Sequence, residues 1–149
     1  MKKKILTGLL CSFVLLITAC NNNKLDVDEV SNIVTSNGNV SLTIKEGTLT
    51  STKATLILEN NSTEDLGYSD SYEIEIKKDN DWYKINVDIG FNEPLYIVES
   101  NQSQELDINW GNGYGSLTPG EYRIIKDVML MNNDDTYEDF YIAAEFTIE

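Results

Sequence analysis

The sequence contains no histidine, only two cysteines, and few basic residues: 11 lysines and arginines against 25 aspartates and glutamates. The absence of histidine excludes imidazole acid–base catalysis, Ser–His and Cys–His nucleophiles, and metal sites that use imidazole ligands. The shortage of basic residues gives a net charge of −14, which argues against binding to nucleic acid, anionic wall polymers or acidic lipid headgroups. A chain of 149 residues suffices for one ordinary domain and little more.

The start of the chain has the pattern of a secretory signal. Three lysines, Lys2–Lys4, precede an almost wholly apolar run from Ile5 to Ala19. A helix of this length would cover only about 22 Å, short of the roughly 30 Å hydrocarbon core of a bilayer. A short apolar run flanked by lysines is typical of a removable signal peptide rather than a membrane span. Residues 1–19 are therefore predicted to be cleaved.

Residues Leu16 to Cys20 (Leu-Ile-Thr-Ala-Cys) resemble a bacterial lipobox, in which small residues precede a cysteine. The resemblance implies that Cys20 receives a diacylglyceryl group and becomes the first residue of the mature chain. Two acyl chains hold a protein stably on a membrane, so the protein is expected on the extracytoplasmic face of the cell membrane. An uncleaved anchor, or a plain signal with a coincidental cysteine, is the alternative. Lipidation of Cys20 leaves no disulfide in the exported domain, whose core must be held by packing alone.

Residues 20–39 are predicted to comprise the lipidated cysteine and a polar, acidic tether. As a flexible coil, this segment would span roughly 25 Å root-mean-square. That length exceeds the Debye length of about 8 Å, so an acidic domain could stand clear of an anionic membrane surface.

From Val40 onward, apolar and polar residues alternate with a period of two, which is typical of half-buried β-strands. The segments that show it are Val40–Ile44, Ala54–Glu59, Tyr72–Lys77, Trp82–Val87, Leu106–Trp110, Tyr122–Met131 and Tyr137–Ile148. Turn residues separate them, and no segment has a convincing helical pattern. Residues 40–149 are therefore predicted to form one all-β domain of seven to eight short antiparallel strands, either a sandwich or a small barrel.

Residues Leu117 to Tyr122 (Leu-Thr-Pro-Gly-Glu-Tyr) have the pattern of a tyrosine corner, which favours the sandwich. In such a corner Pro119 and Gly120 form the turn entering a strand, and the Tyr122 hydroxyl bonds to backbone a few residues upstream. A generic Pro–Gly turn before a strand tyrosine is the alternative. Antibody domains have a cysteine two residues after this tyrosine, whereas this chain has Ile124, as expected for a sandwich without an inter-sheet disulfide.

Several stretches of the predicted domain carry a family resemblance: Val40–Ser51, Ala54–Ser62, Leu106–Trp110, Tyr114–Gly115 and Leu117–Lys126. They resemble the bacterial immunoglobulin-like domains of secreted lipoproteins from low-GC Gram-positive bacteria. The resemblance covers nearly all of residues 40–149. It implies an immunoglobulin-like antiparallel β-sandwich in an extracytoplasmic location, and it brings no catalytic residues.

The residues offer little for catalysis or metal binding. The acidic runs Asp79–Asp81 and Asn132–Asp135 could supply oxygen ligands to Ca²⁺, but solvated hairpin turns account for both and the EF-hand pattern is incomplete. The loop Gly111–Gly115 lacks the lysine and the following helix of a phosphate cradle. Carboxylate pairs for glycoside hydrolysis need a cleft, for which a small sandwich has little room. The sequence therefore predicts a non-enzymatic protein with no catalytic residues, no metal site and no cofactor.

Aromatic residues near turns are the remaining candidates for binding. Trp82, Tyr83 and Tyr114 could form an exposed platform for a ligand, whereas Trp110 is in phase with Leu106 and Ile108 and is expected in the core. Two functions follow. The first is a protein-interaction or envelope accessory module that engages an unidentified protein. The alternative is a neutral-glycan-binding module that uses the aromatic platform.

Overall fold

The fold is that of a computed structural model, which describes residues 25–149 except 37, 133 and 135. The predicted signal peptide, residues 1–19, and the predicted lipidation site, Cys20, lie outside the described residues. No helix within the described residues is long and apolar enough to cross a membrane.

Ten β-strands account for the regular structure of the described residues. They are β1 (Val27–Val30), β2 (Val40–Ile44), β3 (Lys53–Asn60), β4 (Asp65–Tyr68), β5 (Glu73–Lys78), β6 (Asp81–Ile85), β7 (Tyr96–Val98), β8 (Gln102–Asn109), β9 (Gly120–Met131) and β10 (Tyr137–Ile148). All of the segments predicted from the alternating pattern form strands. The all-β prediction is confirmed, and three short strands, β1, β4 and β7, are additional to it.

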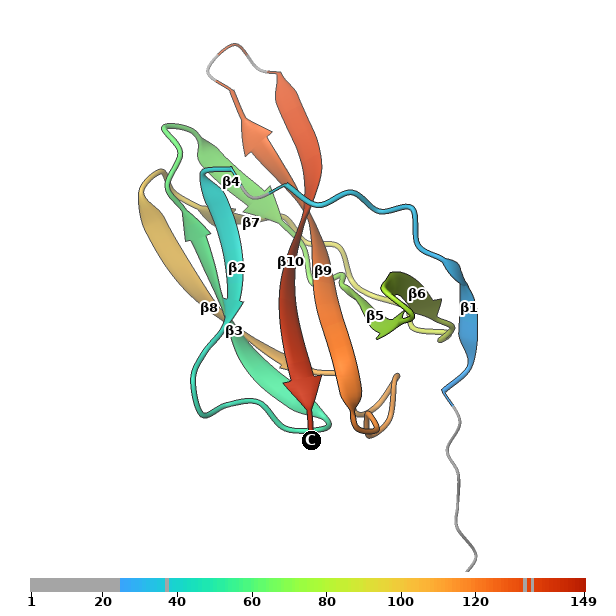
Figure 1. Cartoon of the computed structure of the whole chain (residues 1–149). Coiled ribbons are helices and arrows are strands. Elements are labelled where there is room, and N and C mark those ends of the chain that lie inside the picture. The colour runs from blue at the N-terminus through green and yellow to red at the C-terminus, as the bar shows by residue number, and fades with distance from the viewer. Residues whose placement is uncertain (1–24, 37, 133, 135) are drawn as a thin grey trace, which may run out of the picture.

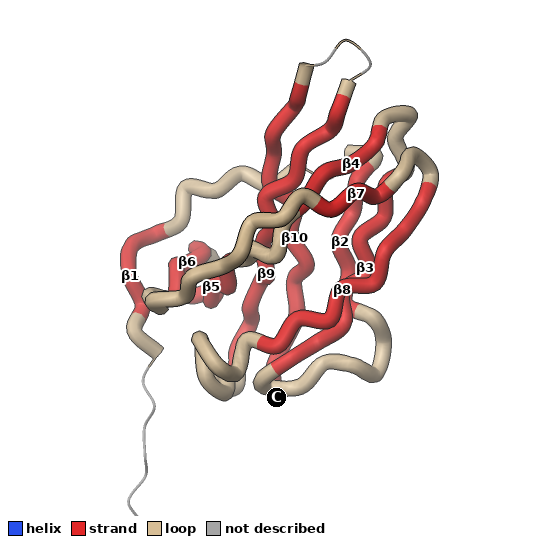
Figure 2. The backbone as a smooth tube through the Cα atoms, turned by 180° about the vertical axis from the view of Figure 1, so that it is seen from behind, coloured by secondary structure: helices blue, strands red, loops and turns tan. Residues whose placement is uncertain are grey.

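The strands form two antiparallel sheets packed face to face (Figures 1 and 2). The small sheet has the order β2-β3-β8, and the large sheet has the order β1-β6-β5-β9-β4-β7, with β10 also paired to β9. One edge of the long strand β9 pairs with β10 along its whole length. Its other edge is shared, because β5 pairs with residues Tyr122–Ile125 and β4 with Val128–Met131. This arrangement confirms the sandwich.

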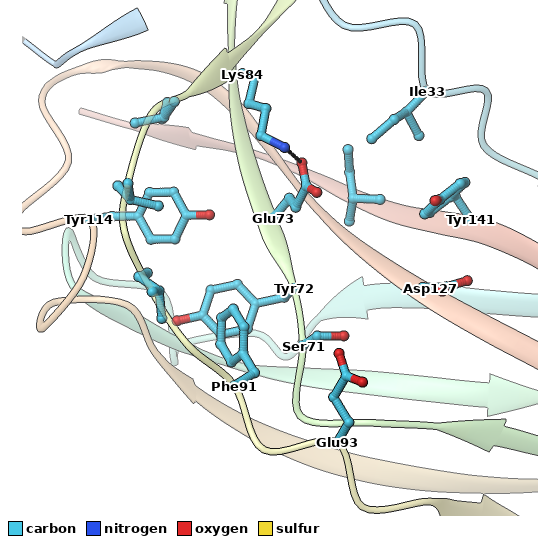
Figure 3. Close-up of a pocket in the computed structure, with 14 residues that line it drawn as sticks. Ile33, Ser71, Tyr72, Glu73, Lys84, Phe91, Glu93, Tyr114, Asp127 and Tyr141 are labelled. Atoms are coloured by element: carbon cyan, nitrogen blue, oxygen red, sulfur yellow. Dashed lines mark ion pairs between the residues drawn. The ribbon is translucent and has the colours of Figure 1, made fainter. Parts of the chain in front are cut away.

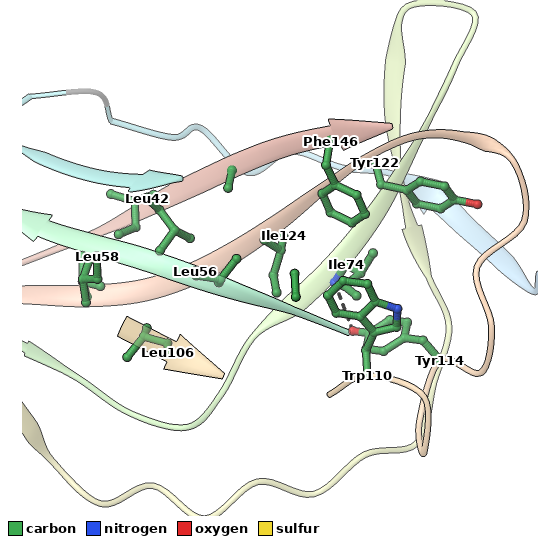
Figure 4. Close-up of a cluster of buried hydrophobic side chains, with 14 of the residues drawn as sticks. Leu42, Leu56, Leu58, Ile74, Leu106, Trp110, Tyr114, Tyr122, Ile124 and Phe146 are labelled. Carbon is green, nitrogen blue, oxygen red and sulfur yellow. Dashed lines mark hydrogen bonds between the residues drawn. The ribbon is translucent and has the colours of Figure 1, made fainter. Parts of the chain in front are cut away.

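The core lies between the sheets and contains one face of each long strand (Figure 4). Trp110 is fully buried, as its phase predicts, and its indole N–H donates to the Ser51 carbonyl at 2.8 Å. The Phe146 ring stacks between Trp110 and Tyr122, at centroid distances of 5.6 and 5.7 Å. The described core includes no disulfide partner, so burial of apolar and aromatic surface stabilises it.

The start of β9 has the geometry of a tyrosine corner. The Tyr122 hydroxyl donates to the Thr118 carbonyl at 2.7 Å, and Leu117 is buried beside it. A Cβ at Gly120 would stand 3.3 Å from the Tyr122 ring, so the glycine makes room for the aromatic side chain.

The segment predicted as a tether is instead part of the fold from Leu25 onward. Strand β1 pairs with the edge of β6, and Leu25 packs against the core. After β1 the chain crosses the outer face of the large sheet as a strap, Ser31–Ser36, to reach β10 (Figure 1). The tether prediction is therefore wrong for the described residues 25–36. Leu25 and Val27 are spaced two apart, and β6 offers an otherwise unpaired edge, so burial and strand pairing outweigh the polar composition.

Candidate functional site

The outer face of the large sheet is divided into a covered half and an open half. The strap covers the half formed by β5, β6 and the start of β9. It is held by Ser31, whose N–H donates to the Trp82 carbonyl at 2.8 Å, and by Ser36, whose N–H donates to the Tyr141 carbonyl at 2.7 Å. The open half is formed by β7, β4 and the ends of β9 and β10.

Beneath the strap lies a buried ion pair. The Arg123 guanidinium donates from Nε and Nη2 to the same Glu75 oxygen at 2.6 Å, and Glu75 is 0% exposed. The Arg123 Cζ lies 4.8 Å from the centre of the Trp82 ring, and its Nη2 donates to the Ile33 carbonyl at 3.4 Å. Arg123 pairs with one Glu75 oxygen while the other, Oε1, is buried without a hydrogen-bond partner, and the guanidinium also binds the strap, so the pair forms a structural cluster.

The structure does not assemble the predicted aromatic platform. Trp82 and Tyr83 are consecutive in β6, so their side chains point to opposite faces of the sheet, and both are half-buried. Tyr114 is only 8% exposed, and its hydroxyl accepts a hydrogen bond from the Ile74 N–H at 3.1 Å. Burial raises the pKa of Tyr114 to about 12. The prediction of a platform that includes Tyr114 is therefore wrong, because the glycine-rich loop folds this ring into the core instead of presenting it to solvent.

Two adjoining hollows form a trough on the outer face of the large sheet, alongside the chain that leads from β6 to β7. The first hollow, of about 360 Å³, is lined by Phe91, Tyr141 and Ile33 among others (Figure 3). The second, of about 290 Å³, is lined by Leu95, Met129 and Gly67 among others. Both hollows share the residues Ser71, Glu93 and Asp127, so they adjoin at these three side chains.

Next to the second hollow the sheet presents an apolar surface to solvent. Gly67 lies directly opposite Ile97 of β7 and Met129 of β9, so all three are on this face. A Cβ at Gly67 would lie within 3 Å of Leu95, Met129 and Met131, so these side chains converge over the glycine and need its missing side chain. We call this surface the apolar face; its residues are Gly67, Leu95, Ile97, Met129, Met131, Tyr137 and Tyr141.

Much of the apolar face is open to water. Leu95 is 58% exposed and Tyr137 is 63% exposed, while Ile97 and Tyr141 are also exposed. Large apolar side chains gathered on one face of a sheet are typical of a surface that is covered by a partner. Sequence reasoning missed this surface because Ile97 lies in the three-residue strand β7, with Leu95 just before it, far along the chain from β9 and β10.

Carboxylates stand where the two hollows meet. Glu93 and Asp127 line both hollows, and Asp139 lies close to Asp127 on the neighbouring strand. Burial and the negative charges of Asp139 and Glu93 raise the pKa of Asp127. In the first hollow, Lys84 Nζ lies 2.9 Å from a Glu73 oxygen (Figure 3). The centre of the trough is therefore acidic.

One buried titratable residue lies on the core side of the same sheet. Lys126 is in phase with the core residues Ile124 and Val128, and its ammonium donates to the carbonyls of Ser69 and Ser71 at 2.7 and 2.9 Å. Burial lowers the pKa of Lys126 to about 8. Both carbonyls belong to the connection between β4 and β5, so the lysine closes the break where these strands meet along β9. A lysine in phase with a core face was the sequence signal for it.

Within the described residues, no three Asp, Glu, Cys or His side chains are placed to hold a metal ion. The turn Asp79–Asp81 joins β5 to β6 as a tight hairpin, with Asp79 and Asn80 at positive φ. The second acidic turn includes residues 133 and 135, which are outside the described residues.

Comparisons with known proteins identify the family. No curated protein matches the chain. Among solved structures it is similar to the ASH / PapD-like domain of human CEP192 (PapD-like domain 7), with 16% identity over 82% of this chain and 96% of that chain and a TM-score of 0.34. A family model described as a bacterial Ig-like domain matches residues 36–147, three quarters of the sequence, and the chain therefore belongs to the bacterial Ig-like domain family.

Proposed function

We propose that the protein is a non-enzymatic, membrane-anchored module that binds another protein on the trough and the apolar face. The family supports the general assignment, since an Ig-like domain suggests a protein-interaction module. The observation that carries the proposal is the gathering of exposed apolar side chains on one half of one sheet, with Leu95 58% and Tyr137 63% exposed. A soluble domain keeps such a surface at a cost in solubility unless a partner covers it.

The anchor in this proposal is lipidated Cys20 on the extracytoplasmic face of the cell membrane. Six residues lie between Cys20 and Val27, and the seven residue steps from one to the other span at most about 25 Å. Since β1 is fixed to β6, the domain would be held close to the membrane by one edge of its large sheet. The β9–β10 hairpin and the apolar face beside it lie toward the opposite end of the molecule from the start of β1 (Figure 1). The anchor would thus direct the apolar face away from lipid and toward proteins.

The anchor is tested by fractionation of cells that express the full chain. Cys20→Ala is expected to release the protein from membranes or to block its processing, because the lipid can no longer be attached. Cys11→Ala is the matched control, and it is expected to leave both membrane retention and maturation unchanged. Normal maturation and membrane retention of Cys20→Ala would contradict the anchor.

The docking face is tested by photo-crosslinking on intact cells, with a photoreactive residue at Ile97 and, as the control, at Glu59 on the small sheet. A protein adduct is expected from position 97 and not from position 59. Adducts from position 59 alone would place the interaction elsewhere. Neutral oligosaccharides are added as competing ligands, and a saturable loss of the adduct would favour the glycan alternative.

A further inference from the structure

The surface described above has a chemistry that restricts what can bind it. Resting on the proposed function, we propose that the trough and the apolar face receive an extended protein segment in which lysine or arginine and apolar residues follow one another at every second position, so that both kinds of side chain face the surface. The basic side chains would lie at Glu93 and Asp127, and the apolar ones against Leu95 and Met129.

The apolar part of the partner follows from the shape of the surface. The second hollow is lined by the apolar side chains of Leu95, Met129 and Pro94, so it offers apolar surface to an aliphatic side chain of the partner. In the first hollow, apolar surface comes from Phe91 and Ile33 and from Tyr141, which lies directly opposite Asp127 on β10. Glu93 and Asp127 line both hollows and so stand where these two apolar surfaces meet. A segment that follows the trough therefore meets apolar, acidic and apolar surface in turn.

The charge of the partner follows from the distribution of ion pairs. Four ion pairs occur among the described residues, and none includes a carboxylate at the centre of the trough: Lys45–Glu105, Lys77–Glu121, Lys84–Glu73 and Arg123–Glu75. Lys126 points to the other side of the sheet. Glu93, Asp127 and Asp139 thus repel one another, and a bound cation would relieve that repulsion.

A second copy of this chain is a poor occupant. Face-to-face association would bring two acidic troughs together, and each chain carries a net charge of −14. Like charges placed opposite one another oppose association, whereas a basic segment gains both apolar burial and charge complementarity.

The experiment measures binding of two synthetic peptides to the purified domain by fluorescence anisotropy. One has valine and lysine in turn at every second position with serine between them, so that both face the same side when the peptide is extended, and the other has glutamate in place of lysine at the same length. Saturable, salt-sensitive binding is expected for the lysine peptide alone. The variant Glu93→Lys/Asp127→Lys should weaken it at least about tenfold, because two attractive contacts become repulsive. The matched variant Glu46→Lys/Glu59→Lys, on the other sheet, changes the net charge equally and should shift binding no more than about twofold.

Each other result overturns the inference in a distinguishable way. Equal binding of both peptides, lost in Leu95→Ser, would overturn the charge preference and leave the apolar face as a docking site. Self-association of the protein, lost in Leu95→Ser, would make a second copy the occupant. If neither peptide binds, the inference is wrong. The crosslinking experiment at position 97 then remains the independent test of whether a protein binds the apolar face.

Discussion

Lys126 is a residue whose chemistry conflicts with its position. It occupies a core position of β9, yet its buried ammonium is stabilised because two carbonyls of the β4–β5 connection accept hydrogen bonds from it. Desolvation nevertheless disfavours the charged form, and the nearby Asp70 offsets this only in part. Lys126 therefore links β9 to the connection between β4 and β5, and the free-energy cost of burying its charge depends on pH.

The free energy of unfolding is predicted to rise between pH 8 and pH 10. The pKa of Lys126 is about 8 in the folded protein, against 10.5 for the solvated side chain of the unfolded chain. In this window the unfolded chain therefore binds more protons, and the free energy of unfolding increases with pH by up to about 2 kcal/mol. Above pH 10 the trend should reverse, because unfolding releases the proton of Tyr114, whose folded pKa is about 12. Urea denaturation of the wild type and of Lys126→Met measures both slopes. The rise should be absent from the variant, and an unchanged rise would assign it to another group.

At the scale of elements, the sheets protect their edges in different ways. Strand β7 has three residues, follows Pro94 closely, and is capped where the Asn60 amide donates to the Val98 carbonyl at 3.0 Å. The edge of β6 is instead covered by β1. A short, capped edge at β7 and a covered edge at β6 both discourage pairing with another chain at these two places.

The strap is predicted to open independently of the core. Ser31→Pro/Ser36→Pro removes the two N–H donors that hold its ends. Hydrogen exchange of the Asn86 amide, which bonds to the Asp26 carbonyl, is expected to accelerate at least about tenfold. The Thr55 amide in the small sheet serves as the internal control and should exchange at its wild-type rate. Equal acceleration at both amides would show that the strap is required for the whole fold.

The predictability of the elements depended on their length. Alternation was sufficient for strands such as β9 and β10, where many positions repeat the same pattern. The alternating pattern did not reveal β4, which contains Gly67, or β7, which has three residues, because both strands are too short to show a repeated alternation of apolar and polar residues. Strand β1 was missed for another reason. It pairs with the edge of β6, and that edge exists only when the rest of the large sheet has formed.

At the scale of the whole molecule, the site was less accessible to sequence reasoning than the fold. Glu93, Leu95 and Asp127 come together only because the chain between β6 and β7 runs beside the gap between β4 and β5. No pattern of neighbouring residues in the sequence indicates that these two parts of the chain lie side by side. Tyr114 was misplaced for the same reason, since a tyrosine between glycines has the composition of an exposed loop while its ring fills the core.

The short connection to the anchor predicts unequal access to the two ends of the molecule. Single cysteines are introduced at Glu29, near the anchor, and at Asp134, in the β9–β10 hairpin, and are labelled on intact cells with a bulky maleimide. Asp134→Cys is expected to react at least about threefold faster, because the proposed lipid on Cys20 would hold β1 within about 25 Å of the membrane. The difference should disappear in protein released by Cys20→Ala. Equal rates on the membrane would indicate a longer connection.

The attachment of β1 has a mechanical consequence. If the proposed lipid on Cys20 were pulled, tension would enter the chain at β1, which pairs with β6 alone, before it reached any strand of the central sandwich. Peeling away β1 and the strap would leave Val40 as the first fixed residue, and the greatest reach from the membrane would grow from about 25 Å to about 70 Å. The domain could then extend its range across the envelope without unfolding.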